Sequence, residues 1–205
     1  MKYKNLTVSQ KGLSLIESAM VLAISAVVVS GVLYYYNQAQ ENRKLEEGIK
    51  QIQTIAATVN KLYTNSTTRL QNGDDAANNK VVEAISAISG IPTKKLSNGN
   101  AKVFTTPSGQ WVQLWVEANS PINTYQLETQ VQSVSSCISY ATLNMGTIMA
   151  GKTQVITDKT NHVNNSNSNS STNFSLSPSI ASDACERAKN AANGNNIKVR
   201  YTLRY

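Results

Sequence analysis

Glu17 is the residue of this sequence whose position most demands a chemical role. It is the one charged residue in the apolar run from Leu13 to Leu33. A lone carboxylate in an apolar membrane helix costs roughly 3 kcal/mol on insertion scales, so it needs a partner or a function. A plain membrane anchor would carry no such residue. The alternative is a tolerated polar side chain that reaches out of the membrane near its surface.

Cys137 and Cys185 are the other candidates for chemistry, and both follow the apolar run. In an oxidising exported compartment, an even number of cysteines favours a structural disulfide. Closing a loop of this length would contribute about 4 kcal/mol. A zinc site lacks ligands, because neither cysteine lies in a C-x-x-C motif and the one histidine, His162, lies in a polar stretch. A nucleophilic thiol would need a base, and none is evident.

Signatures of catalysis are missing from the sequence. It contains no phosphate-binding glycine loop, no Ser/His/Asp set and no metal-ligand cluster. The paired carboxylates Glu46/Glu47 and Asp74/Asp75 are adjacent, so neither pair converges on one face of a helix. We therefore expect a protein that is not an enzyme and that has no metal or cofactor.

The apolar run has the length and the flanks of a membrane-spanning helix. Its 21 residues would span about 31 Å as a helix, enough to cross a bilayer core. Lys2, Lys4 and Lys11 precede it, which predicts a cytoplasmic N-terminus and an exported remainder. A cleaved secretory signal over residues 1–36 is the alternative. It fits less well, because the small residue placed for cleavage, Gly12, precedes the run.

The charge of the chain is partly a feature of this leader. The 205 residues carry 19 Lys and Arg against 12 acidic residues, a net charge of +7. Removing Met1–Gly12 takes away three of the 19, which leaves 16 against 12 and a net charge of +4. No basic cluster remains after the leader, so we expect no nucleic-acid partner.

A single helix should run from about residue 14 to 63. Tyr34, Tyr35 and Tyr36 fall where the apolar run meets water, the usual place of an aromatic belt. Beyond them, apolar residues recur at helical spacing with polar residues between them. These residues are Leu45, Ile49, Ile52, Ile55, Val59 and Leu62. The helix thus has an apolar half and an amphipathic half, and the amphipathic half should pack on a sheet.

The residues around Glu17 resemble those of type IV pilins. Glu17 follows, five residues later, the glycine that ends a short basic leader, and the segment Leu13–Ala23 looks most like that of the type IVb class, the bundlins. The segment Cys137–Gly146 is similar to a cysteine-led helix of the same family. Many type IVa pilins carry a kinking proline in the apolar half of this helix, and this sequence has none there. The one helix-weakening residue in the run is Gly31.

This resemblance implies specific processing of the N-terminus. A prepilin peptidase would cleave between Gly12 and Leu13 and methylate the new α-amine. In a filament, whose apolar helices pack without water, that amine could pair with Glu17 of a neighbouring subunit. A buried pair of this kind fixes the register of one helix against the next, which is its best-attested use.

The rest of the chain predicts further helices and strands. A short helix is marked by Val81, Val82, Ile85 and Ile88 and is stopped by Gly90-Ile-Pro92. Two more short helices should carry the cysteines, one from about Val131 and one over Asp183–Ala192. Strands are predicted at Lys102–Thr106, Gln110–Ala118, Ile122–Gln130, Thr153–Thr157 and Ile197–Tyr205. The fold class is therefore α+β, with a long helix packed on an antiparallel or mixed sheet, as in the type IV pilin fold.

The predicted domains follow from these elements and from the resemblance. We expect a leader at 1–12, a transmembrane and filament-core helix at 13–36, and a periplasmic globular domain at 37–205. The disulfide would enclose a D-region, 137–185. The resemblance also implies that the terminal strand inserts among the earlier strands.

Two segments of the globular domain have open roles. Val112, Leu114 and Val116 should face the long helix, which leaves Trp111 and Trp115 on the other face. The two tryptophans would bind a partner or a sugar ring, or pack under a loop or against a neighbouring subunit. The stretch His162–Asn173 is almost entirely Asn and Ser, which predicts an exposed, mobile loop.

The expected function is the major structural subunit of a type IVb pilus, serving adhesion, cell aggregation or conjugative contact. The resemblance implies these partners: copies of itself, a prepilin peptidase, an inner-membrane assembly platform with its ATPase, and an outer-membrane secretin. It also implies a location in the inner membrane of a Gram-negative bacterium before assembly and in an extracellular filament afterwards. The alternatives are a minor pilin or type II secretion pseudopilin, and a monomeric anchored domain that binds through Trp111 and Trp115.

Overall fold

The computed structural model describes residues 14–70, 75–96, 99–116, 122–158, 160–163, 174–191 and 196–205. By its contacts the chain forms two compact units, which divide between Asn42 and Arg43. In the described residues the first unit is helix alone, the beginning of α1 (Leu15–Tyr63). The second unit contains the rest of α1 and the remaining elements. We predicted that the globular domain starts at residue 37. The second unit begins six residues later, at Arg43.

The second unit is built on a seven-stranded sheet in which every pairing is antiparallel. The order of its strands is β1-β2-β3-β4-β7-β5-β6. Their bounds are β1 Thr93–Lys95, β2 Lys102–Thr105, β3 Trp111–Trp115, β4 Thr124–Val131, β5 Gln154–Thr157, β6 Thr160–Asn161 and β7 Ile197–Arg204. The predicted strands are all present, and β1 and β6 are two short edge strands that the sequence did not predict.

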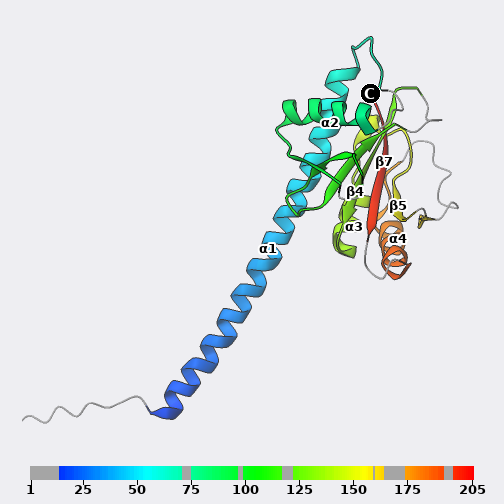
Figure 1. The fold of residues 1–205 in the computed structure, drawn as a ribbon. Coiled ribbons are helices and arrows are strands. Elements are labelled where there is room, and N and C mark those ends of the chain that lie inside the picture. Colours follow the sequence, from blue (N-terminus) through cyan, green and yellow to red (C-terminus); the bar gives the residue numbers. More distant parts are fainter. Residues whose placement is uncertain are drawn as a thin grey trace, which may run out of the picture. The chain divides into compact units, whose positions relative to one another are not determined.

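The C-terminal strand β7 lies inside the sheet. Figure 1 shows it between β4 and β5. It pairs with β4 over eight residues, from Thr124 opposite Arg204 to Val131 opposite Ile197. The insertion of the last strand among the earlier ones, which the resemblance implied, is confirmed.

One face of the sheet and the amphipathic half of α1 form the core. Ile52, Ile55 and Val59 of α1 are completely buried. They share one apolar cluster with the alternating residues of the central strands: Val112, Leu114, Tyr125, Leu127, Val199, Tyr201 and Leu203. The other members of the predicted stripe, Leu45, Ile49 and Leu62, are partly buried against the same cluster. The apolar face of α1 thus packs against the apolar residues that alternate along the strands, as the sequence predicted.

Three shorter helices complete the unit. They are α2 (Asp75–Ser89), α3 (Val134–Ala141) and α4 (Pro178–Ala191), and a 3-10 turn, η1, spans Gly146–Ile148. We expected α4 to begin at Asp183. It begins five residues earlier, at Pro178. Pro178 fits the first helical position, because its missing N–H would be unpaired there anyway, and the Ser177 carbonyl accepts the N–H of Ala181 at 2.9 Å.

Candidate functional site

The N-terminal half of α1 exposes an almost continuous apolar surface. Its large apolar side chains are between 56% and 86% exposed. They are Leu15, Ile16, Met20, Val21, Leu22, Ile24, Val27, Val28, Val29, Val32 and Leu33, followed by Tyr34, Tyr35 and Tyr36. By length and composition, α1 is the one helix among the described residues that could cross a membrane, with a mean hydropathy of 2.1 in its most apolar window. An exposed apolar surface of this extent marks a site of interaction with a membrane or with other chains.

Glu17 lies in the first turn of this surface. Its carboxylate accepts a hydrogen bond from the backbone N–H of Ser14, at 3.1 Å. The Ser14 hydroxyl in turn accepts from the N–H of Ile16, at 3.3 Å. An acidic side chain in a first turn also interacts favourably with the helix dipole. Among the described residues, Glu17 makes no ion pair.

The expected processing site lies outside the described residues. Gly12 and Leu13 both precede Ser14, the first residue whose placement is described. Cleavage between them, and pairing of the Leu13 amine with Glu17, therefore stay predictions.

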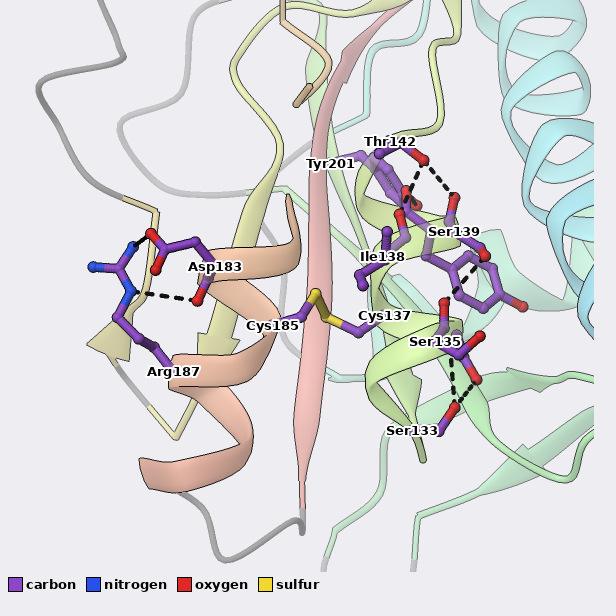
Figure 2. The surroundings of a disulfide bond; sticks show 12 residues. Ser133, Ser135, Cys137, Ile138, Ser139, Thr142, Asp183, Cys185, Arg187 and Tyr201 are labelled. Atoms are coloured by element: carbon purple, nitrogen blue, oxygen red, sulfur yellow. Dashed lines mark hydrogen bonds and ion pairs between the residues drawn. A yellow bond between two sulfur atoms is a disulfide. The ribbon is translucent and has the colours of Figure 1, made fainter. Parts of the chain in front are cut away.

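The disulfide joins α3 to α4. Cys137 and Cys185 are both completely buried, with their sulfur atoms 1.96 Å apart and their Cα atoms 6.0 Å apart. Figure 2 shows the bond connecting the two helices. The structure thus contains the disulfide that the sequence favoured.

Both helices are held by polar contacts as well as by the disulfide. The Ser133 hydroxyl caps α3 by accepting the N–H of Ser136 at 3.1 Å. At the other end, the Thr142 hydroxyl donates to the carbonyl of Ile138 at 2.9 Å. On α4, Asp183 and Arg187 form an ion pair at 2.6 Å, visible in Figure 2. Such caps matter because isolated helices this short are marginal in water.

Comparison with known proteins identifies the family. The profile of the bundlin family matches residues 37–204. The chain belongs to the bundlin family. It is 32% identical over 197 residues to the protein described as the major structural subunit of bundle-forming pilus in Escherichia coli O111:H-, a match that covers 95% of both chains. The protein of the same description in Escherichia coli O127:H6 (strain E2348/69 / EPEC) matches equally, at 32% over 197 residues and 95% of each chain.

A solved structure supports the fold of this bundlin-family chain. The type IV b pilin from Salmonella typhi aligns with a TM-score of 0.52 at 14% identity, covering 77% of this chain and 98% of that chain. At this identity the likeness concerns the fold alone. The resemblance to type IVb pilins seen in the sequence is confirmed. Membership of a structural pilin family also confirms that the chain is not an enzyme.

The sheet face away from α1 contains a polar cluster that the sequence did not reveal. Glu128 is 3% exposed and pairs with two cations of β7, Arg200 at 2.7 Å and Lys198 at 3.4 Å. The Arg200 guanidinium also lies over the ring of Trp115, 5.0 Å from its centroid. Glu128 and Arg200 face each other directly in the β4–β7 register. Their partnership depends on strand pairing across 72 residues, for which the sequence carried no local signal.

Trp111 and His162 are the remaining candidate residues from the sequence. Trp111 is half-buried and lines a hollow of about 570 Å³ together with Asp75, Lys94 and Lys95. His162 lies just after β6, with its ring nitrogen 2.5 Å from the Thr157 hydroxyl. Burial and the nearby Arg187 charge lower the pKa of His162. In the part of the chain that the structure describes, no three His, Cys, Asp or Glu residues group as metal ligands.

Proposed function

We propose that this protein is the major structural subunit of a type IVb pilus. The observation that carries the proposal is the 32% identity, across 95% of both chains, to the major structural subunit of bundle-forming pilus. The exposed apolar side chains of the first half of α1 support it, because polymerisation needs an apolar surface through which subunits contact one another. The biological output is adhesion, cell aggregation or conjugative contact.

We further propose the order in which the subunit is inserted, processed and assembled. The chain enters the inner membrane of a Gram-negative bacterium as a prepilin, with residues 13–36 spanning the bilayer and the domain 37–205 in the periplasm. A prepilin peptidase cleaves it between Gly12 and Leu13 and methylates the new amine. An inner-membrane platform with its ATPase then drives docking, and an outer-membrane secretin admits the growing filament to the surface.

Within the filament, we infer that Glu17 pairs with the Leu13 amine of a neighbouring subunit. In the single chain, the Glu17 carboxylate is held at the N-terminus of α1 by the N–H of Ser14, close in sequence to the amine that cleavage would create. Burying that carboxylate without a partner would be costly, and a cation at the same depth removes the cost.

The experiment that tests this function is a mass and N-terminal analysis of filaments sheared from intact cells. The proposal expects this chain to dominate the sheared fraction, beginning at a methylated Leu13. A minor pilin or pseudopilin would be processed in the same way but scarce in that fraction. An intact Met1, or cleavage beyond Tyr36, would contradict the proposal.

A further inference from the structure

Gly48 is a buried glycine inside α1, where a glycine weakens the helix by about 1 kcal/mol relative to alanine. Its surroundings give a reason for it. A Cβ atom at this position would lie 2.1 Å from the hydroxyl oxygen of Tyr140 and 3.4 Å from ring atom Cζ. The glycine therefore lets the phenol of Tyr140 rest directly on the backbone of α1. By contrast, Gly31 of the same helix has nothing within 4 Å of such a Cβ.

Tyr140 belongs to α3, one turn after Cys137. At eight residues, α3 is too short to be stable alone, so its position depends on what holds it. Three attachments do so within the second unit. The disulfide fixes it to α4, the Tyr140 phenol fixes it to α1, and the hydroxyl of Tyr201 on β7 donates to the Tyr140 carbonyl at 2.6 Å.

We propose that α3 couples the disulfide to α1, so that oxidation of Cys137 and Cys185 holds Tyr140 on Gly48 and thereby fixes the docked half of α1. Oxidation removes two protons and two electrons from the two thiols, and a disulfide of a thiol–disulfide oxidoreductase accepts both and becomes a dithiol. The disulfide bond is then a condition for a firmly held α1. Where this concerns filaments, it rests on the proposed function: only oxidised subunits would enter assembly with the docked half of α1 firmly held.

The coupling predicts a specific form of non-additivity. In the oxidised protein α3 cannot retreat, so a methyl group at residue 48 must collide with Tyr140. In a protein without the disulfide, α3 has lost one of its attachments and can move away from the methyl group. The cost of the same substitution should then be smaller.

The test uses the full chain in detergent and follows thermal unfolding. The variants are Gly48→Ala, Tyr140→Phe and their double variant, each with the native cysteines and in a Cys137→Ser, Cys185→Ser background. Gly31→Ala is the matched control, because it makes the same change on the same helix where nothing is near. With the disulfide, Gly48→Ala should lower Tm by about 5 °C, the size expected for overpacking in a domain of this length.

Two further results are expected. Tyr140→Phe should restore most of the loss, because it removes the colliding oxygen and leaves the ring carbon at an ordinary contact distance. In the serine background the loss should shrink at least twofold, while Gly31→Ala, which changes helix propensity alone, has the same effect in both backgrounds. An equal loss with and without the disulfide, or no rescue by Tyr140→Phe, overturns the proposal.

A second measurement covers the case in which the serine background is too unstable to melt cooperatively. Hydrogen exchange at low temperature would compare the oxidised chain with the chain reduced by a dithiol. The amides around Gly48 should lose protection together with those of α3, while β4 and β7 keep theirs. If α1 loses protection only together with β4 and β7, the proposal is wrong. None of these readouts requires filaments, so they stand or fall separately from the proposed function.

Discussion

The two halves of α1 have similar apolar side chains and opposite surroundings. Ile24 in the first half is 65% exposed, whereas Ile55 in the second half is completely buried among strands of the sheet. Helix geometry is the same in both halves, so the difference lies in what surrounds the helix. The amphipathic half meets its partner within the subunit, and the all-apolar half leaves its surface for a membrane or for other copies of the chain.

The two halves of α1 therefore contribute to different free energies, that of folding the subunit and that of membrane insertion and assembly. Residues of the second half contribute to the stability of the single subunit, and residues of the first half contribute to insertion and assembly. Substitutions in the two halves should therefore affect different measurements.

The sharpest form of the comparison is a pair of identical substitutions. Ile55→Ala should destabilise the subunit by about 4 kcal/mol, because it removes a fully buried side chain and leaves a cavity. Ile24→Ala should leave the unfolding of the detergent-solubilised chain unchanged, since that side chain is 65% exposed and belongs to the first unit. Denaturant unfolding of both variants measures the difference. Equal destabilisation by the two substitutions would refute the division between the halves.

Loss of the disulfide should affect the second unit only. Cys137→Ser should cost about 4 kcal/mol by releasing the constraint between α3 and α4 and should reduce the amount of subunit in cells. Insertion of the first half of α1 into the membrane should continue, which fractionation would show. Free-thiol labelling of both cysteines in native surface-isolated protein would contradict a structural disulfide.

Glu128 and Glu47 allow a buried ion pair to be compared with an exposed one. Glu128 is 3% exposed and pairs with Arg200 and Lys198, so Glu128→Gln should destabilise the subunit by about 2 kcal/mol. Glu47 forms an exposed pair with Arg43 on α1, so Glu47→Gln should change stability by less than about 0.5 kcal/mol. Thermal unfolding at low and high salt measures both. A Glu128 variant as stable as the Glu47 variant would show that the buried cluster is not stabilising.

The smallest effect should come from pH. The pKa of His162 is lowered in the folded protein by burial and by Arg187, so the unfolded chain binds the proton more readily. Stability should therefore fall slightly as the pH falls through and below the ordinary histidine pKa of about 6.5. His162→Gln should remove that part of the pH dependence, as seen by comparing Tm at pH 7 and pH 5. An unchanged pH profile in the variant would exclude His162 as its cause.

Much of the fold could be predicted from the sequence because its signals are local. The run after Leu13 and the stripe from Leu45 to Leu62 predicted α1, and alternation predicted the central strands. The helix α4 begins at Pro178 rather than at Asp183, because its Ser177-Pro178 start lies in a polar stretch without helical apolar spacing. The edge strands β1 and β6 are only three and two residues long, too short to show a period.

The contacts that matter most inside the second unit were not predictable in the same way. Gly48 reads as a helix-weakening residue until Tyr140, far along the chain, is placed against it. Glu128 and Arg200 read as surface charges until β7 is placed beside β4. Both depend on tertiary structure, for which period and spacing give no information. The exposed site is the reverse case, because Glu17 stood out from sequence alone.

The measurement that tests the account most directly follows stability and filament yield together in Glu17→Val. The account predicts that the variant inserts, forms its disulfide and melts within about 1 °C of the wild type, because Glu17 has no ion-pair partner within the described chain. Its filaments should be absent from the sheared fraction, and mixed filaments should contain it only sparsely. Glu41→Val, which removes a carboxylate from the same helix beyond the apolar run, should leave filaments intact. Filaments of Glu17→Val at normal yield would contradict the account.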